Sequence, residues 1–148
     1  MRLLIQRVTR ASVVVDGKTT GGIEKGLLIF LGVGEGDSEQ ICTEMAGKAS
    51  RLRIFEDESG KMNLDVTQVS GSVLVVSQFT LYGDTGKGNR PNFMAAAKPE
   101  EARKLYEKFI LELKQILGEN KVAEGVFGAM MEVELINDGP VTIWIDSC

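Results

Sequence analysis

Two strongly apolar segments constrain the fold of this chain more than any other feature. They cover residues 26–33 (GLLIFLGV) and 72–81 (SVLVVSQFTL), and both present hydrophobic side chains to the two faces of a strand. A half-exposed strand alternates polar and apolar residues, whereas a strand covered on both faces is continuously apolar. We therefore predict two central, buried strands, and the second becomes polar at its end.

Two amphipathic helices are predicted beside these strands. The clearest covers residues 98–117: Pro99 stands in the first turn, and Gly118 ends the helix. Asp37 is the expected N-cap of the other, with Gln40 as its capping-box partner. Hydrophobic residues at helical spacing form one stripe on each helix: Ala102, Leu105, Tyr106, Phe109, Ile110, Leu113 and Leu117 on the first, and Ile41, Met45, Ala49 and Leu52 on the second.

Several shorter segments have strand patterns. Asp16-Gly17 is typical of a tight hairpin turn, and residues 137–140 (NDGP) are expected to form a second turn. About seven strands and two helices are too many strands per helix for a doubly wound sheet, so we predict an α/β fold with the helices on one side. No linker or repeat divides residues 1–148, which favours a single domain. The remaining predicted strands are 2–15, 18–23, 53–64 (a hairpin around 58–60), 131–135 and 141–145.

The composition excludes several functions. The chain contains no histidine, so it has no Ser-His-Asp or Cys-His triad and no imidazole metal ligand. Cys42 and Cys148 form no zinc spacing; we expect a buried side chain and a chain end. The net charge of −4 argues against coating of nucleic acid, although it allows a local contact to an RNA end. Since no signal peptide or membrane-spanning run is visible, we predict a cytoplasmic protein without a membrane partner.

Some motifs resemble sites without fitting them. Residues 32–36 read GxGxG rather than the dinucleotide pattern GxGxxG, so we interpret them as a strand-to-helix turn. Residues 86–88 (GKG) lack the other elements of a P-loop. The carboxylates at 56–58, 132 and 134 are expected at the surface. We predict no metal site and no cofactor.

Three segments are candidates for a functional site. Ser77, Gln78, Phe79 and Thr80 place hydroxyls, an amide and backbone N–H donors at the end of a buried strand, where they could form an oxyanion hole or simply end the strand. In residues 137–140, Pro140 removes a backbone donor, and the Gly139-Pro140 peptide is either cis, with Pro140 at the third turn position, or part of a plain trans turn. Residues 82–93 are glycine-rich and basic through Lys87 and Arg90; they favour either a phosphate-backbone contact or a solvated loop.

Together these segments resemble one family, the D-aminoacyl-tRNA deacylases of the bacterial and eukaryotic type. SQFTLYGDTGKGNRP at 77–91 and NDGPVT at 137–142 are similar to its two signature motifs. MRLLIQRVTRASVVVDG at the start resembles its opening hairpin, and FGAMMEVEL at 127–135 resembles the strand before the second motif. Met130 and Gly86 depart from the acidic and basic residues that the family often has there, which affects a pocket edge and tRNA contacts.

The resemblance implies a three-layer α/β/β fold, a homodimer and a tRNA substrate. The reaction it implies is hydrolysis of the ester that joins a D-amino acid, or mischarged glycine, to the terminal ribose of tRNA. Each active site would combine residues 77–80 of one chain with Gly139 and Pro140 of the other, a cis pair that rejects L-amino acids. Asn137 belongs to the same substrate-binding motif, and Phe127 and Met131 match positions lining the pocket for the terminal adenosine or the aminoacyl group.

A mechanism without histidine is available to such a site. Backbone N–H groups around Phe79 and Thr80 would bind the carbonyl oxygen of the ester, and the ribose 2′-hydroxyl would activate the water. Thr80 then orients the reactants, whereas the competing hypothesis makes it a covalent nucleophile without a nearby base. A non-catalytic RNA-binding dimer of the same fold and a small-molecule esterase are the alternatives from other functional classes.

Overall fold

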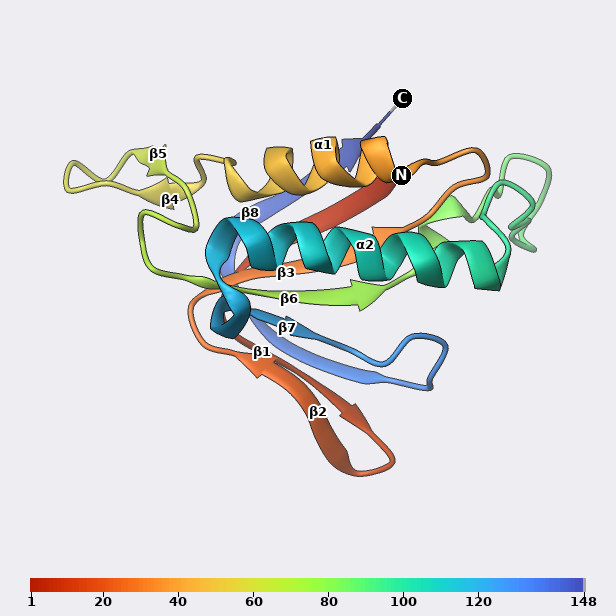
Figure 1. The fold of residues 1–148 in the computed structure, drawn as a ribbon, viewed down its shortest axis with the longest axis horizontal. Coiled ribbons are helices and arrows are strands. Elements are labelled where there is room, and N and C mark those ends of the chain that lie inside the picture. The colour runs from red at the N-terminus through yellow and green to blue at the C-terminus, as the bar shows by residue number, and fades with distance from the viewer. Residues whose placement is uncertain (148) are drawn as a thin grey trace.

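A mixed sheet, a small hairpin and two helices form the fold (Figure 1). The computed structural model describes residues 1–147, so the expectation for Cys148 lies outside the described residues. The elements are β1 (Arg2–Val15), β2 (Lys18–Ile23), β3 (Gly26–Gly32), α1 (Glu39–Ser50), β4 (Phe55–Glu56), β5 (Met62–Leu64), β6 (Ser72–Ser77), the 3-10 helix η1 (Phe79–Tyr82), α2 (Pro99–Leu117), the 3-10 helix η2 (Glu119–Lys121), β7 (Val122–Glu124) and β8 (Glu132–Asp146).

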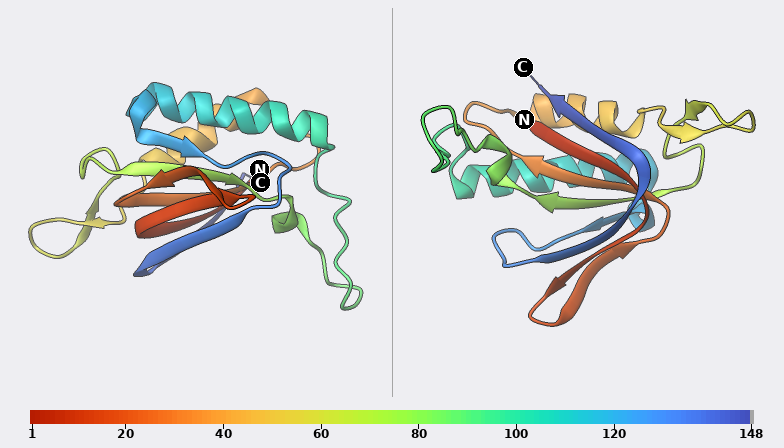
Figure 2. Two further views of the ribbon diagram at one scale, coloured as in Figure 1. Left: turned by 90° about the horizontal axis from the view of Figure 1, so that it is seen from below. Right: turned by 180° about the vertical axis from the view of Figure 1, so that it is seen from behind.

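The main sheet is built around β1, which is long enough to have two partners on one side. Its first half pairs antiparallel with β3 and its second half with β2, while β8 runs along the opposite side of both halves. β6 joins β3 in parallel, and β7 joins β6 in parallel. The sheet curls until β2 approaches β7: a Cβ atom on Gly21 would lie 2.3 Å from the Glu124 carbonyl oxygen. Figure 2 shows the resulting curved, nearly closed sheet.

Two hydrophobic cores lie on the two faces of this sheet. The larger fills the space under α1 and α2, which cover the same side of the sheet (Figure 2), and includes Leu31, Val75 and Phe109. The smaller lies within the curl of the sheet and includes Val8 and Leu74. The predicted α/β/β layering, with both helices on one side, is therefore confirmed, as is the burial of β3 and β6 on both faces.

The start of α1 differs from the prediction. Ser38, not Asp37, is the N-cap, and its hydroxyl accepts the N–H of Ile41 at 3.4 Å. The Asp37 carboxylate instead accepts the backbone N–H of Gly34 at 2.7 Å, which closes the turn after β3. The Gln40 side chain donates to Glu44 rather than completing a capping box. At the other predicted turn, Asp16-Gly17, both residues have the positive φ expected of the hairpin.

Two further expectations need correction. The strand predicted over 72–81 ends at Ser77, because residues 79–82 form the 3-10 helix η1. Residues 137–140 do not join two strands in a hairpin: they lie within the single strand β8, whose two parts both pair with β1, with register shifts on either side of Val8. A β1 strand of 14 residues has room for both parts, a tertiary effect that a local turn pattern does not reveal.

Within residues 1–147, neither helix combines the length and hydrophobicity needed to cross a membrane.

Candidate active site

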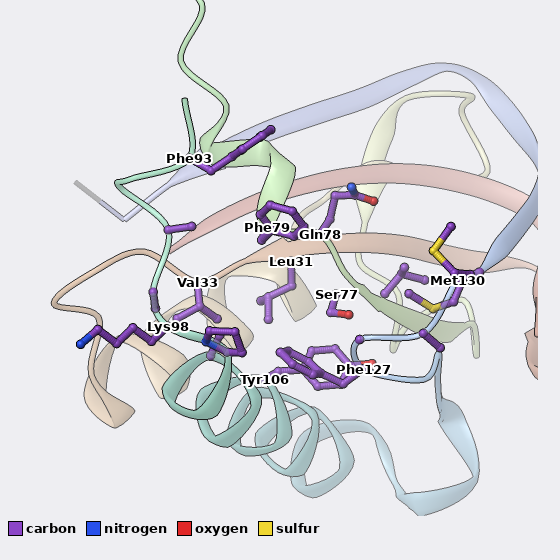
Figure 3. Close-up of a pocket in the computed structure, with 18 of the residues that line it drawn as sticks. Leu31, Val33, Ser77, Gln78, Phe79, Phe93, Lys98, Tyr106, Phe127 and Met130 are labelled. Atoms are coloured by element: carbon purple, nitrogen blue, oxygen red, sulfur yellow. The ribbon is translucent and has the colours of Figure 1, made fainter. Parts of the chain in front are cut away.

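A cavity of about 740 Å³ opens where the parallel strands β3 and β6 end (Figure 3). Its other walls come from the first turns of α2 and from the loop between β7 and β8. The carboxyl ends of parallel strands are the usual position of ligand sites in such sheets. The lining residues are Leu31, Val33, Val76, Ser77, Gln78, Phe79, Phe93, Ala96, Ala97, Lys98, Pro99, Ala102, Tyr106, Phe127, Gly128, Ala129, Met130, Met131 and Val133.

Aromatic side chains form two walls of the cavity. Tyr106 is anchored from α2 to β6, because its hydroxyl donates to the Val75 carbonyl oxygen at 3.0 Å. The Phe127 ring lies 5.6 Å from the Tyr106 ring, measured between centroids. On the opposite wall, Phe79 and Phe93 meet edge to face at 5.1 Å. Burial raises the pKa of Tyr106, so its hydroxyl stays protonated and is unsuited to act as a base.

The end of β6 places polar groups at the cavity. The Gln78 N–H donates to the Leu31 carbonyl oxygen at 2.7 Å, which continues the β3–β6 pairing by one residue. The Gln78 side-chain amide donates to the Thr80 hydroxyl. Phe79 and Thr80 occupy the first turn of η1, where backbone N–H groups have no partner within the helix and can donate to a ligand oxygen. Ser77, Gln78 and Phe79 line the cavity, whereas Thr80 lies outside the lining and is exposed.

The segment 137–140 lies elsewhere in the same chain. The Gly139-Pro140 peptide is cis, and both residues are exposed and absent from the cavity lining. Arg7 holds this segment: its guanidinium donates to the Asp138 carbonyl oxygen at 3.1 Å. Arg7 pairs with Leu27 at the start of β3, whereas the cavity lies at the end of that strand. One chain therefore does not bring Gly139 and Pro140 together with residues 77–80.

Two of the other predicted site residues, Phe127 and Met131, line the cavity, whereas Asn137, Lys87 and Arg90 are absent from its lining. The Asn137 side chain links β8 to the neighbouring β1: it donates to the carbonyl oxygens of Val141 in its own strand and of Arg7 in β1, each at 3.0 Å. Lys87 and Arg90 are exposed on a loop whose base is closed by two backbone hydrogen bonds between Asp84 and Asn92.

Some residues of the cavity were not predicted as site residues. Tyr106 was assigned to the hydrophobic stripe of α2, where most members are core residues, and its polar hydroxyl was the only signal of a second role. Lys98 is the one charged residue that the described part of the chain contributes to the lining, and Phe93 follows the glycine-rich loop. Among residues 1–147, no group of three His, Cys, Asp or Glu side chains is placed to hold a metal ion.

The fold and the cavity define a small α/β/β protein with a substrate-sized, largely apolar site at the ends of two parallel strands. The glycines at 32 and 34 belong to its framework rather than to a nucleotide loop: a Cβ atom on Gly34 would lie 2.4 Å from the Tyr82 hydroxyl oxygen.

Comparison with known proteins identifies the family. The family model described as D-Tyr-tRNA(Tyr) deacylase matches residues 4–146. The D-aminoacyl-tRNA deacylase of Koribacter versatilis is 56% identical over 147 residues, covering 99% of this chain and 97% of that protein. The D-aminoacyl-tRNA deacylase of Thermotoga petrophila is 54% identical over 149 residues, with the same coverage of 99% and 97%.

Solved structures agree in fold. A c-Myc DNA Unwinding Element Binding Protein is 40% identical, with a TM-score of 0.95 over 100% of this chain and 99% of that chain. A probable eukaryotic D-amino acid tRNA deacylase is similar in fold only, at 16% identity and a TM-score of 0.81 over 97% of both chains. The chain belongs to the D-Tyr-tRNA(Tyr) deacylase family, and deacylases are hydrolytic enzymes.

Proposed function

We propose that this protein hydrolyses the ester bond between a D-amino acid and the terminal ribose of tRNA, and that it also accepts glycine mischarged onto tRNA. The observation that carries the proposal is the cavity beside residues 77–79, in a chain 56% identical to a D-aminoacyl-tRNA deacylase. Its volume of about 740 Å³ falls within the range of roughly 300–1,000 Å³ that small-molecule sites occupy. An aminoacylated adenosine is a ligand of that size.

Catalysis in this proposal relies on main-chain donors and on the RNA. The N–H groups of Phe79 and Thr80 stabilise the developing oxyanion, and one such donor contributes on the order of 3 kcal/mol. The ribose 2′-hydroxyl beside the ester assists the attacking water. The Gln78 amide already donates to the Thr80 hydroxyl, which supports an orienting role for Thr80 rather than nucleophilic attack.

A Thr80→Ala variant separates the two roles of this threonine. An orienting side chain predicts slower but measurable hydrolysis, because the backbone donors and the 2′-hydroxyl remain. Complete loss of hydrolysis in a folded variant contradicts the RNA-assisted mechanism, and retained hydrolysis excludes a covalent threonine.

The chirality filter in this proposal comes from a second subunit of a homodimer. Gly139 and Pro140 are exposed and distant from the cavity of their own chain, which supports their use in the site of another. Carbonyl oxygens of Gly139 of the partner subunit and Pro140 of the partner subunit would face Cα of the substrate. Main-chain atoms form a wall whose position does not depend on a rotamer, so an L side chain clashes while glycine passes. Pro140→Ala is expected to relax discrimination between D- and L-tyrosyl-tRNA; an unchanged ratio of kcat/KM values contradicts the filter.

The tRNA body would be held by further contacts, and Lys87 and Arg90 are the first candidates because they lie on an exposed basic loop next to η1. Since charged tRNA is the substrate, the cytoplasm remains the predicted location.

The decisive experiment is release of D-tyrosine from D-tyrosyl-tRNA at enzyme concentrations far below the substrate, with the molar mass in solution measured in parallel. Multiple turnovers by a dimer support the proposal. Binding of tRNA without turnover favours a non-catalytic RNA-binding dimer, and equal hydrolysis of a free D-tyrosine methyl ester favours a small-molecule esterase.

A further inference from the structure

Among residues 1–147, Lys98 is the only charged residue that lines the cavity. It is exposed and stands at the N-cap of α2, and Figure 3 shows its side chain extending from the rim rather than into the cavity. Among residues 1–147, no carboxylate belongs to the cavity lining, although Glu100 and Glu101 follow Lys98 in the first turn of α2. Lys98 therefore gives the lining itself a positive charge in a chain whose net charge is −4.

Arg103 adds a second cation five residues after Lys98, on α2. Its guanidinium carbon lies 5.2 Å from the centroid of the Phe127 ring, which itself lines the cavity. The contact places the guanidinium beside the aromatic wall, outside the enclosed volume. A guanidinium held on an aromatic face keeps its N–H donors available for an anion.

The other basic residues of α2 are already paired. Lys104 lies 3.5 Å from Glu39, Lys108 lies 2.5 Å from Glu112, and Lys114 lies 3.5 Å and 3.6 Å from two glutamates. Among residues 1–147, neither Lys98 nor Arg103 has an ion-pair partner. These two cations are therefore the ones on this helix that are free to bind an anion at the rim.

We propose that Lys98 and Arg103 bind the backbone phosphates of the last nucleotides of tRNA, where the strand leaves the cavity. The inference rests on the proposed function, in which the terminal adenosine occupies the cavity. Two local phosphate contacts explain how a chain with a net negative charge holds RNA, since affinity depends on the phosphates neutralised rather than on total charge. Arg103 is on a 19-residue helix that also supplies cavity wall, and Lys98 is the N-cap of that helix, so the backbone of both residues has a fixed position relative to the cavity.

The experiment compares D-tyrosyl-tRNA with D-tyrosyl-adenosine, which keeps the ester and the terminal nucleoside but has no phosphate and no further nucleotide. The double variant Lys98→Gln/Arg103→Gln is expected to raise KM for D-tyrosyl-tRNA on the order of ten-fold at 0.2 M salt, from a slope of about 0.7 per single-strand phosphate contact. Its kcat on that substrate and its KM for D-tyrosyl-adenosine are expected to stay close to wild type. Lys98→Gln/Arg103→Lys should have a lower KM for D-tyrosyl-tRNA than Lys98→Gln/Arg103→Gln, because a lysine at position 103 still carries the positive charge.

The matched control is Lys104→Gln, which removes the same charge from the neighbouring position of the same helix but from a residue paired with Glu39. It is expected to leave KM for both substrates unchanged. A second readout is salt dependence. Lowering the salt from 0.2 M to 0.05 M should improve wild-type KM by about seven-fold more than that of the double variant, which corresponds to two lost contacts.

The outcomes separate this inference from the proposed function. A wild-type protein that hydrolyses neither substrate contradicts the proposed function itself. If the wild type is active but the double variant loses activity equally on both substrates, Arg103 merely supports Phe127 and the phosphate site is overturned. An unchanged KM of the double variant for D-tyrosyl-tRNA also overturns the phosphate site. A rise in KM for this substrate that occurs in Lys87→Gln and Arg90→Gln but not in the double variant overturns it too, because the RNA strand then lies over the loop that carries Lys87 and Arg90.

Discussion

Replacing Gly34 by alanine tests whether the glycines after β3 are part of the framework of the site. An ideal Cβ atom at Gly34 would lie 2.4 Å, 2.7 Å and 2.9 Å from three atoms of the Tyr82 side chain. Tyr82 is 9% exposed and is the last residue of η1, and the Arg2 guanidinium covers its ring at 4.4 Å. The ring therefore has little room to move away, and relief of the clash must shift η1.

The expected cost follows from two opposing effects. Overpacking a well-packed site costs about 1–3 kcal/mol. Replacing glycine by alanine returns about 0.4–1 kcal/mol by restricting the unfolded chain. The net destabilisation of about 1–2 kcal/mol corresponds to a fall in Tm of roughly 3–8 °C for a domain of this size. Since η1 carries Phe79 and Thr80, a shift near 1 Å is also expected to reduce kcat on D-tyrosyl-tRNA by up to about 100-fold.

The assay is urea unfolding at fixed protein concentration together with single-turnover hydrolysis. Gly22→Ala is the matched control, because its Cβ atom would have only ordinary contacts, at 3.6 Å and 3.7 Å, and its stability should change by less than about 0.5 kcal/mol. Adding Tyr82→Phe to Gly34→Ala removes the closest atom and should recover at least about 0.5 kcal/mol of coupling energy. The reasoning is refuted if Gly34→Ala keeps the wild-type free energy of unfolding and activity, or if the coupling energy is zero.

Three further predictions concern residues outside the chirality filter. Burial raises the pKa of the Cys42 thiol to about 11, so at pH 8 the native protein should resist alkylation at Cys42 until it unfolds, as peptide mapping would show; rapid native labelling contradicts this. Tyr106→Phe should cost only about 0.5–1.5 kcal/mol in urea unfolding, because the Val75 carbonyl keeps the Gly125 N–H as a donor; a loss above about 3 kcal/mol means that the ring moves. Hydrogen bonds from the N–H groups of Lys61 and Ser59 lower the pKa of Asp57 in the folded state, so its stabilisation is present above the unfolded pKa and is lost as the pH falls through the folded value. Asp57→Ala should therefore destabilise more at pH 7 than at pH 3, and an equal effect at both contradicts the assignment.

Most of the fold is encoded by local patterns. The β1–β2 hairpin forms at Asp16-Gly17 because both turn residues adopt positive φ, and α2 ends at Gly118, whose φ is 108°. Two of the predictions that were wrong have different causes. The Asp37 carboxylate accepts the N–H of Gly34, three residues earlier, so a competing local hydrogen bond leaves Ser38 as the N-cap. Residues 137–140 are part of β8 because β1, which is distant in the sequence, is long enough to pair with both parts of it. That pairing cannot be predicted from residues 137–140 themselves.

Only part of the candidate site can be predicted from the sequence. A buried strand that ends in Ser77-Gln78 is locally unusual, which is why it could be singled out. The wall residues could not be predicted from the sequence, since Tyr106 and Ala102 have the same spacing as core residues of α2. The packing of α2 against β6 is what shows that they face a cavity. Likewise, Arg103 looks like any surface arginine until Phe127 is placed beside it.

The buried Arg7 guanidinium holds the segment 137–140, although the burial of a charge costs free energy. Arg7 is 6% exposed, donates to the Ile54 carbonyl oxygen at 2.6 Å and lies 3.2 Å from the Asp138 carboxylate. An apolar residue of similar volume often stabilises a fold as well as a buried ion pair does, so stability alone does not require an arginine here. The role of the arginine is to orient the backbone: together with Asn137, it fixes the main chain on both sides of Gly139. The proposed chirality filter of main-chain atoms requires that rigidity, because a displaced wall admits the L side chain that the filter is proposed to exclude.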